Sequence, residues 1–216
     1  DSVKAIGADS GASITSPAAV TGSAGVGAFR TVPTVALGTG LSSTGINDGK
    51  LMRFTITADA ARQASIGELT FNIASSSGVT VTNVQVKAYT NSGYSTAVSS
   101  LTTAGLFSTT ANVVSGTDFA VVPAATGSTL EIPAGATYYF EVTASLSGIV
   151  SGSSIVTKLM GDSGTGAAAA VFNTTVGNFV WSANSTTTSA TTNNDWFNGA
   201  GVTDLPSGGL IQTRSQ

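Results

Sequence analysis

The chain lacks cysteine and histidine altogether, and only 9% of its 216 residues are charged. Without cysteine it can form no disulfide, no thiolate metal site and no cysteine nucleophile. Without histidine it lacks the most common general base and the most common transition-metal ligand, which excludes a Ser-His-Asp triad. These absences remove most hydrolase active sites, so we expect that the protein is not an enzyme and needs no cofactor.

The few charged residues do not suggest a charged partner. The net charge is −3, and the basic residues do not form a patch that could neutralise a phosphate backbone, so nucleic acid is not an expected partner. No apolar run approaches the length of a transmembrane helix, and we expect that the chain does not span a membrane. Serine, threonine and glycine take the place of charged residues, which is typical of a surface covered by copies of the same protein or of a protein outside the cell.

The clearest pattern that is present lies in residues 129–147, TLEIPAGATYYFEVTASLS. From Thr137 onward, apolar and polar residues alternate strictly over about ten positions, which predicts a strand with one buried and one wet face. The wet face would include Glu141. A shorter strand ends at Ile132, and Pro133 to Gly135 supply a turn, so we expect a hairpin at the centre of a sheet.

The same alternation recurs along the chain. The phase of the valines changes at Thr82-Asn83, which indicates a β-bulge. The segment AAAAVF at 167–172 is the best helix candidate. Short strands separated by turn signals predict an all-β, antiparallel sandwich of the Ig-like or jelly-roll-like kind over residues 29–216. Strands are predicted at 29–37, 51–59, 66–74, 79–90, 96–101, 105–114, 118–122, 155–161 and 176–182.

Residues 1–28 are rich in glycine, serine and alanine and are expected to form an extended N-terminal arm. One interpretation is a flexible leader, because this composition buries little surface. The other is an arm that adds a strand to the sheet of a neighbouring subunit. The apolar residues that would make those polymerisation contacts are Val3, Ala5, Ile6 and Ile14.

Two stretches resemble a known group of proteins. Residues 28–89 contain RTVPTVA, FTITADA and IGELTFNIASSSGVT, and residues 179–208 contain FVWS, NDW and LPSG. This succession is similar to that of exported proteins from candidate phyla radiation (Parcubacteria-like) bacteria. The resemblance implies an exported, surface-associated β-sandwich and brings no catalytic residue with it. The hairpin predicted at 129–147 is more loosely similar to those of extracellular fibre subunits.

The side chains that could carry chemistry each have a structural alternative. Glu131 and Glu141 could face each other across the predicted hairpin, but a glycosidase needs two carboxyls lining a cleft, and solvated strand residues are favoured. Calcium would require oxygen ligands, and candidate loops lie at 47–48, 162–163 and 193–195, although none matches a known calcium-loop spacing. No metal site is therefore predicted.

Trp181 and Trp196 could stack on sugar rings, although the alternation around Trp181 favours a place in the core.

We therefore expect a structural subunit of an extracellular filament or surface layer, located at the cell surface, that joins copies of itself by strand addition of the arm. The alternative is a cell-surface adhesin or glycan-binding module that uses Trp181 and Trp196. The two hypotheses place opposite demands on these rings, since a binding platform needs them exposed and a structural subunit needs them buried.

Overall fold

The computed structural model describes residues 31–125, 127, 129–163, 177–183 and 196–216, and the backbone of two strands at 4–6 and 13–15. The predicted helix at 167–172 and the domain boundary at 28/29 lie outside these residues. The described chain is nearly all β and forms two antiparallel sheets, which confirms the predicted sandwich-like architecture. The element η1 (Ile46–Asp48) is a single turn of 3-10 helix.

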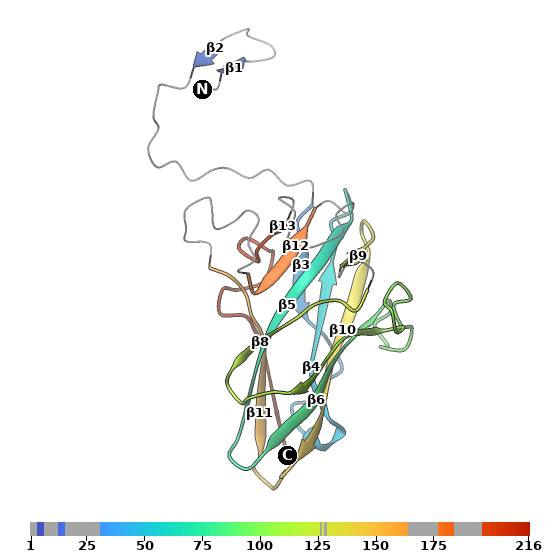
Figure 1. Ribbon diagram of the computed structural model, residues 1–216, viewed down its shortest axis with the longest axis vertical. Helices are drawn as coiled ribbons and strands as arrows, with labels where there is room; N and C mark the ends of the chain where they lie inside the picture. The colour runs from blue at the N-terminus through green and yellow to red at the C-terminus, as the bar shows by residue number, and fades with distance from the viewer. Residues whose placement is uncertain are drawn as a thin grey trace.

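The first sheet has five strands (Figure 1). In spatial order they are β3 (Thr34–Leu37), β4 (Lys50–Thr57), β10 (Thr137–Ser147), β6 (Thr80–Tyr89) and β7 (Leu106–Asn112). The alternating segment that dominates the sequence is β10, and it occupies the central position, as predicted. Its long pairings with β4 and β6 bury Phe140 and Val142 completely.

The second sheet has seven strands, built around the long β5 (Ala64–Ser75). One side of β5 pairs with β11 and β12, and the other side pairs with β8 and β9. The remaining strands, β13 and β14, extend the sheet beyond β12 and β11. The bounds are β8 (Asp118–Val121), β9 (Leu130–Ile132), β11 (Ser154–Leu159), β12 (Phe179–Ser182), β13 (Trp196–Phe197) and β14 (Leu210–Ser215).

Aromatic rings from both sheets meet in the core between them. The rings of Phe54 and Phe140 stack with centroids 4.8 Å apart, and Phe71 of the opposite sheet lies 5.9 Å from Phe54. All three side chains are fully buried. Offset and tilted ring pairs of this kind add to the burial of apolar area, so this cluster ties the two sheets together.

The bulge predicted at Thr82-Asn83 is present. Thr143 and Ser145 of β10 pair with Gln85 and Thr82, so β6 carries one residue more than its partner at this point. Asn83 has a positive φ of 49°, which asparagine tolerates better than most residues. The extra residue is the reason why the apolar phase of β6 changes within one strand.

The predicted hairpin at 129–147 is wrong in its pairing. The turn itself forms, because the Ala136 N–H donates to the Pro133 carbonyl at 2.9 Å and Gly135 has a φ of +70°. However, β9 pairs with β5 in the seven-stranded sheet, whereas β10 pairs with β4 and β6 in the five-stranded sheet. The turn therefore carries the chain across the core, and Glu131 and Glu141 belong to different sheets.

One further strand prediction was wrong, and two strands were not predicted. Residues 96–101 form a loop that bonds to β6 through the Val98 N–H and the Ala88 carbonyl, and Val98 and Leu101 are buried. Apolar residues here anchor a loop instead of alternating in a strand. Conversely, β13 and β14 were not predicted, because β13 has only two residues and β14 turns Gln212 and Arg214 toward the interior.

Candidate functional site: the two lateral sides of the sandwich

One lateral side of the sandwich, where β3 and β14 form the sheet edges, is closed by main-chain hydrogen bonds. The Val35 N–H donates to the Thr203 carbonyl at 3.0 Å, and the Thr203 N–H donates to the Pro33 carbonyl at 3.2 Å. The Ser215 N–H donates to the Ser43 carbonyl at 2.8 Å. We call this side, which comprises β3, β14, residues 42–50 and Thr203, the closed side, because each of these edge strands has a main-chain partner there, β3 at Val35 and β14 at Ser215.

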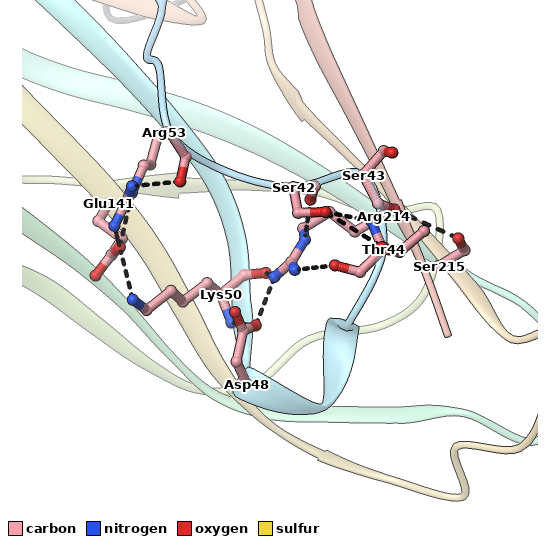
Figure 2. Close-up of polar contacts among 10 residues, drawn as sticks. Ser42, Ser43, Thr44, Asp48, Lys50, Arg53, Glu141, Arg214 and Ser215 are labelled. Atoms are coloured by element: carbon pink, nitrogen blue, oxygen red, sulfur yellow. Dashed lines mark hydrogen bonds and ion pairs between the residues drawn. The ribbon is translucent and has the colours of Figure 1, made fainter.

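Hydrogen bonds from Arg214 connect β14 to residues 42–50 on the closed side, as Figure 2 shows. Its side chain is 2% exposed, and its guanidinium donates to the carbonyls of Ser42 at 2.7 Å and Thr44 at 2.6 Å. It also donates to the Lys50 carbonyl and forms an ion pair with Asp48. A planar guanidinium offers five N–H donors in a fixed geometry, which lysine could not match.

The carboxylate of Asp48 completes this clamp. Burial works to raise the pKa of Asp48, but hydrogen bonds from Arg214 and the Lys50 N–H, together with their positive charges, outweigh it and hold the pKa below its usual value. The Lys50 N–H donates to Asp48 Oδ1 at 2.9 Å. Sequence analysis missed the role of Arg214, because a lone arginine in a polar C-terminal segment carries no signal of burial.

The opposite lateral side is formed by β7 in one sheet and by β8 and β9 in the other, and we call it the open side. The segment after β8 joins the sheets, since the Ala124 N–H donates to the Phe107 carbonyl at 2.7 Å. Two aliphatic side chains at this side are exposed to solvent, Val114 by 70% and Val122 by 47%. Single exposed aliphatic residues also occur on the closed side, at Leu37 (44%) and Ile211 (48%), so they do not by themselves distinguish the two sides.

The strand-forming part of the N-terminal arm consists of β1 (Lys4–Ile6) and β2 (Ser13–Thr15), which pair with each other. Their antiparallel register brings Ala5 opposite Ile14 and Ile6 opposite Ser13. They form a two-stranded sheet of their own and do not pair with either larger sheet. Three of the four predicted polymerisation residues thus lie in strands, and Val3 lies outside the described residues.

The predicted glycan platform does not have the required exposure. Trp181 and Trp196 are 1% and 0% exposed, and the Trp181 indole N–H donates to the Asn198 carbonyl at 3.0 Å. Stacking on a sugar needs an open aromatic face, so the prediction that these two rings contact glycans is wrong. Trp181 belongs to β12, whose four residues are all buried, and Trp196 is the buried first residue of β13.

Carboxylates in two of the three candidate calcium loops are engaged by N–H donors. Asp48 binds Arg214, as described above. Asp162 accepts hydrogen bonds from the backbone N–H groups of Asn178, Phe179 and Gly199, the last at 2.7 Å. Lone pairs that point at N–H groups are not free to coordinate a cation. The loop at 193–195 lies outside the described residues, and within them no group of three acidic side chains could hold a metal ion.

Glu141 is not solvated, which corrects its prediction as a wet-face residue. It is 6% exposed and pairs in register with Arg53 of β4, whose Nε and Nη2 atoms lie 2.9 and 2.8 Å from Glu141 Oε1 (Figure 2). The Arg53 guanidinium also lies 4.0 Å from the centroid of the Tyr94 ring. The ring covers the ion pair from a loop, so Glu141 is buried by a residue far away in sequence.

A shallow hollow lies on the five-stranded sheet next to this cluster. Its volume is about 260 Å³, and Gln85, Lys87 and Tyr89 of β6 line it together with Thr103 and Leu106. Tyr89 is only half-buried. An aromatic face, an amide and an ammonium group therefore meet here, which sequence analysis did not anticipate because the residues come from separate segments.

Comparisons with known proteins add no relative to this picture. No family model, no curated protein and no solved structure matches the chain. Among the described residues, no helix is both long enough and apolar enough to cross a membrane.

Proposed function

We propose that the protein is a structural subunit of an extracellular filament or surface layer, in which the N-terminal arm joins neighbouring copies by β-strand addition. The observation that carries this proposal is a mismatch between two parts of the chain. Residues 4–6 and 13–15 form strands that belong to neither large sheet, while the outer edge of β7 beyond Phe107 has no partner among the described residues. If the N-terminal strands of one subunit paired with β7 of a neighbour, the backbone groups of both would gain hydrogen-bond partners.

The physical basis is the backbone. An added strand supplies a row of main-chain hydrogen bonds and removes an exposed sheet edge, and neither requires a particular side chain. The scarcity of charged residues supports close packing of copies, because few like charges would meet at a contact. Attachment to the cell envelope and an extracellular location are part of the same proposal.

Electron microscopy of the purified full chain, compared with a variant that starts at Gly22, tests the proposal. Because β1 and β2 pair only with each other, the truncation leaves every strand of the two large sheets in place. We expect ordered filaments or sheets from the full chain and monomers from the truncated chain, with equal melting temperatures. Full-length protein that stays monomeric over a wide concentration range would contradict self-assembly through the arm.

The hollow beside Tyr89 supports glycan binding as a second candidate function. A half-buried aromatic ring next to Gln85 and Lys87 provides a stacking face and hydrogen-bond donors, which the buried tryptophans do not. If the protein is an adhesin, a glycan array should give a signal that Tyr89→Ala abolishes and Trp181→Phe retains. An array without any signal would remove this candidate.

A further inference from the structure

Most strand edges of the described sandwich are unsuited to accept another strand. On the closed side, β3 bonds to Thr203 through Val35, and β14 bonds to Ser43 through Ser215 and contains the charged Arg214. On the open side, β9 has only three residues, with Glu131 at its centre and Pro133 directly after it. The four-residue strand β8 begins with Asp118. Short strands, charges and proline are the usual means by which proteins prevent pairing at an edge.

Strand β7 lacks these protections. It is seven residues long, and its sequence, LFSTTAN, contains neither a charged residue nor a proline. Thr109 and Thr110 are β-branched, which favours the extended conformation. A single register shift, near Phe107, lies at the start of the strand and leaves the remainder regular. Among the described strands, β7 is thus the longest edge without a charge or proline.

The register shows which backbone groups of β7 face outward. Ala88 directs its N–H and its carbonyl to Gly105 and Val98, on the β7 side of β6. Val86 and Val84 point the same way, since backbone groups alternate in direction along a strand, and their partners are Ser108 and Thr110. The residues between and after these partners, Thr109 and Ala111, therefore direct their N–H and carbonyl groups away from β6.

Nothing in the described chain bonds to these outward groups. The backbone hydrogen bonds on this side end at the Phe107 carbonyl, which accepts from Ala124. Both Thr109 and Ala111 are exposed. Beyond Asn112 the exposed side chain of Val114 continues the surface, and a pocket of about 120 Å³ lies close by, lined by Ile73, Val81 and Val113 among others. An aliphatic side chain of an added strand would fit into a space of this size.

We infer that the outer edge of β7, through Thr109 and Ala111, is the acceptor for the N-terminal strands of a second copy of this chain. This inference rests on the proposed function and names the surface on which it acts. The occupant is a second copy because the strand segments at 4–6 and 13–15 are the only described strands outside the two large sheets. Only Lys4 among these six residues is charged, which suits an edge without charges.

Separating donor from acceptor tests the inference. Thr109→Pro removes an outward N–H from the edge while leaving the arm intact, and proline is tolerated at an edge position whose N–H faces solvent. Thr109→Val keeps that N–H and serves as the matched control. Ala111→Lys provides a second block, by charge instead of by loss of a donor, and Ala111→Ser is its uncharged control. The melting temperature of each variant shows whether it has folded.

We expect the full chain, Thr109→Val and Ala111→Ser to assemble, and Thr109→Pro and Ala111→Lys to remain monomeric with nearly unchanged melting temperatures. Thr109→Pro is then a donor without an acceptor edge, and the chain that starts at Gly22 is an acceptor without an arm. An equimolar mixture of these two should give heterodimers by light scattering and nothing larger.

The outcomes distinguish the two proposals. If the full chain assembles and the chain from Gly22 does not, but folded Thr109→Pro and Ala111→Lys still assemble, strand addition stands and β7 is not the acceptor. A mixture that stays monomeric also overturns the assignment to β7. If the full chain never assembles, the proposed function and the assignment of β7 as an acceptor are both overturned.

Discussion

The two lateral sides of this sandwich solve the problem of an exposed sheet edge in different ways. On the closed side, Ser43 and Thr203 bond to the edge strands, and Arg214 ties three carbonyls and a carboxylate together. On the open side, a seven-residue strand without charge or proline leaves the outward groups of Thr109 and Ala111 unpaired within the described chain. The difference teaches that an edge can be protected by the chain's own polar contacts, and that where these are absent the edge is available to a partner.

The largest effect expected from this comparison comes from Arg214→Met. The methionine side chain has a similar length but leaves the carbonyls of Ser42, Thr44 and Lys50 without their donor. Unpaired buried acceptors cost about 1–3 kcal/mol each, and partial access of water reduces the total, so we expect a loss of about 3 kcal/mol. Denaturant unfolding measures it. The unfolding midpoint of Arg214→Lys should lie between those of the wild type and Arg214→Met. An unchanged midpoint for Arg214→Met would show that Arg214 does not stabilise the closed side.

We expect Thr157→Val to raise the free energy of unfolding by about 1 kcal/mol. The residue pairs with β14, so this variant tests a second buried polar position at the closed side. Thr157 of β11 lies opposite Gln212 of β14 and is fully buried. Thr157 Oγ1 and Gln212 Oε1 are both buried without a hydrogen-bond partner. Valine has nearly the same shape and removes the hydroxyl, so the midpoint of denaturant unfolding should rise. A drop would mean that the hydroxyl makes a contact in solution.

The smallest expected effect is a change in the pH dependence of stability caused by Asp48→Asn. Because the folded-state pKa of Asp48 lies below its value in the unfolded chain, its ionised form stabilises the fold above the unfolded value, and this contribution disappears as the pH falls through the folded value. We expect the melting temperature of the wild type to fall more on acidification through this range than that of Asp48→Asn. Parallel pH profiles would show that this carboxylate does not contribute to the closed side.

The positions of most strands could be predicted because their burial follows a simple period. In β10 and β4, and in β5 from Leu69 to Ile73, apolar residues recur at alternate positions, and these residues pack into a core shared by Phe54, Phe71 and Phe140. The bulge in β6 was also predictable, because the extra residue shifts the apolar phase within the strand. These features depend on neighbours in sequence.

Pairing and polar burial could not be predicted in the same way. The turn at Pro133 has the residues of a hairpin, but whether the strands on its two sides pair with each other depends on the positions of β4 and β5. The alternation predicts that Glu141 faces solvent, whereas in the structure Arg53 and Tyr94 cover it. For Trp181 the alternation favoured the core without excluding an exposed platform, and packing alone decides that the ring is buried.

By itself, the sequence determined the all-β class, the placement of β10 at the centre of a sheet and the exclusion of cysteine and histidine chemistry, because composition and a period of two are local properties. Only the tertiary structure decided which edge is closed and which is open. That decision depends on Arg214 meeting the carbonyls of Ser42 and Lys50 from the far end of the chain, and on the outward groups of Thr109 and Ala111 in β7 finding no partner among the described residues. Such contacts are set by the path of the whole chain and leave no periodic trace in the sequence.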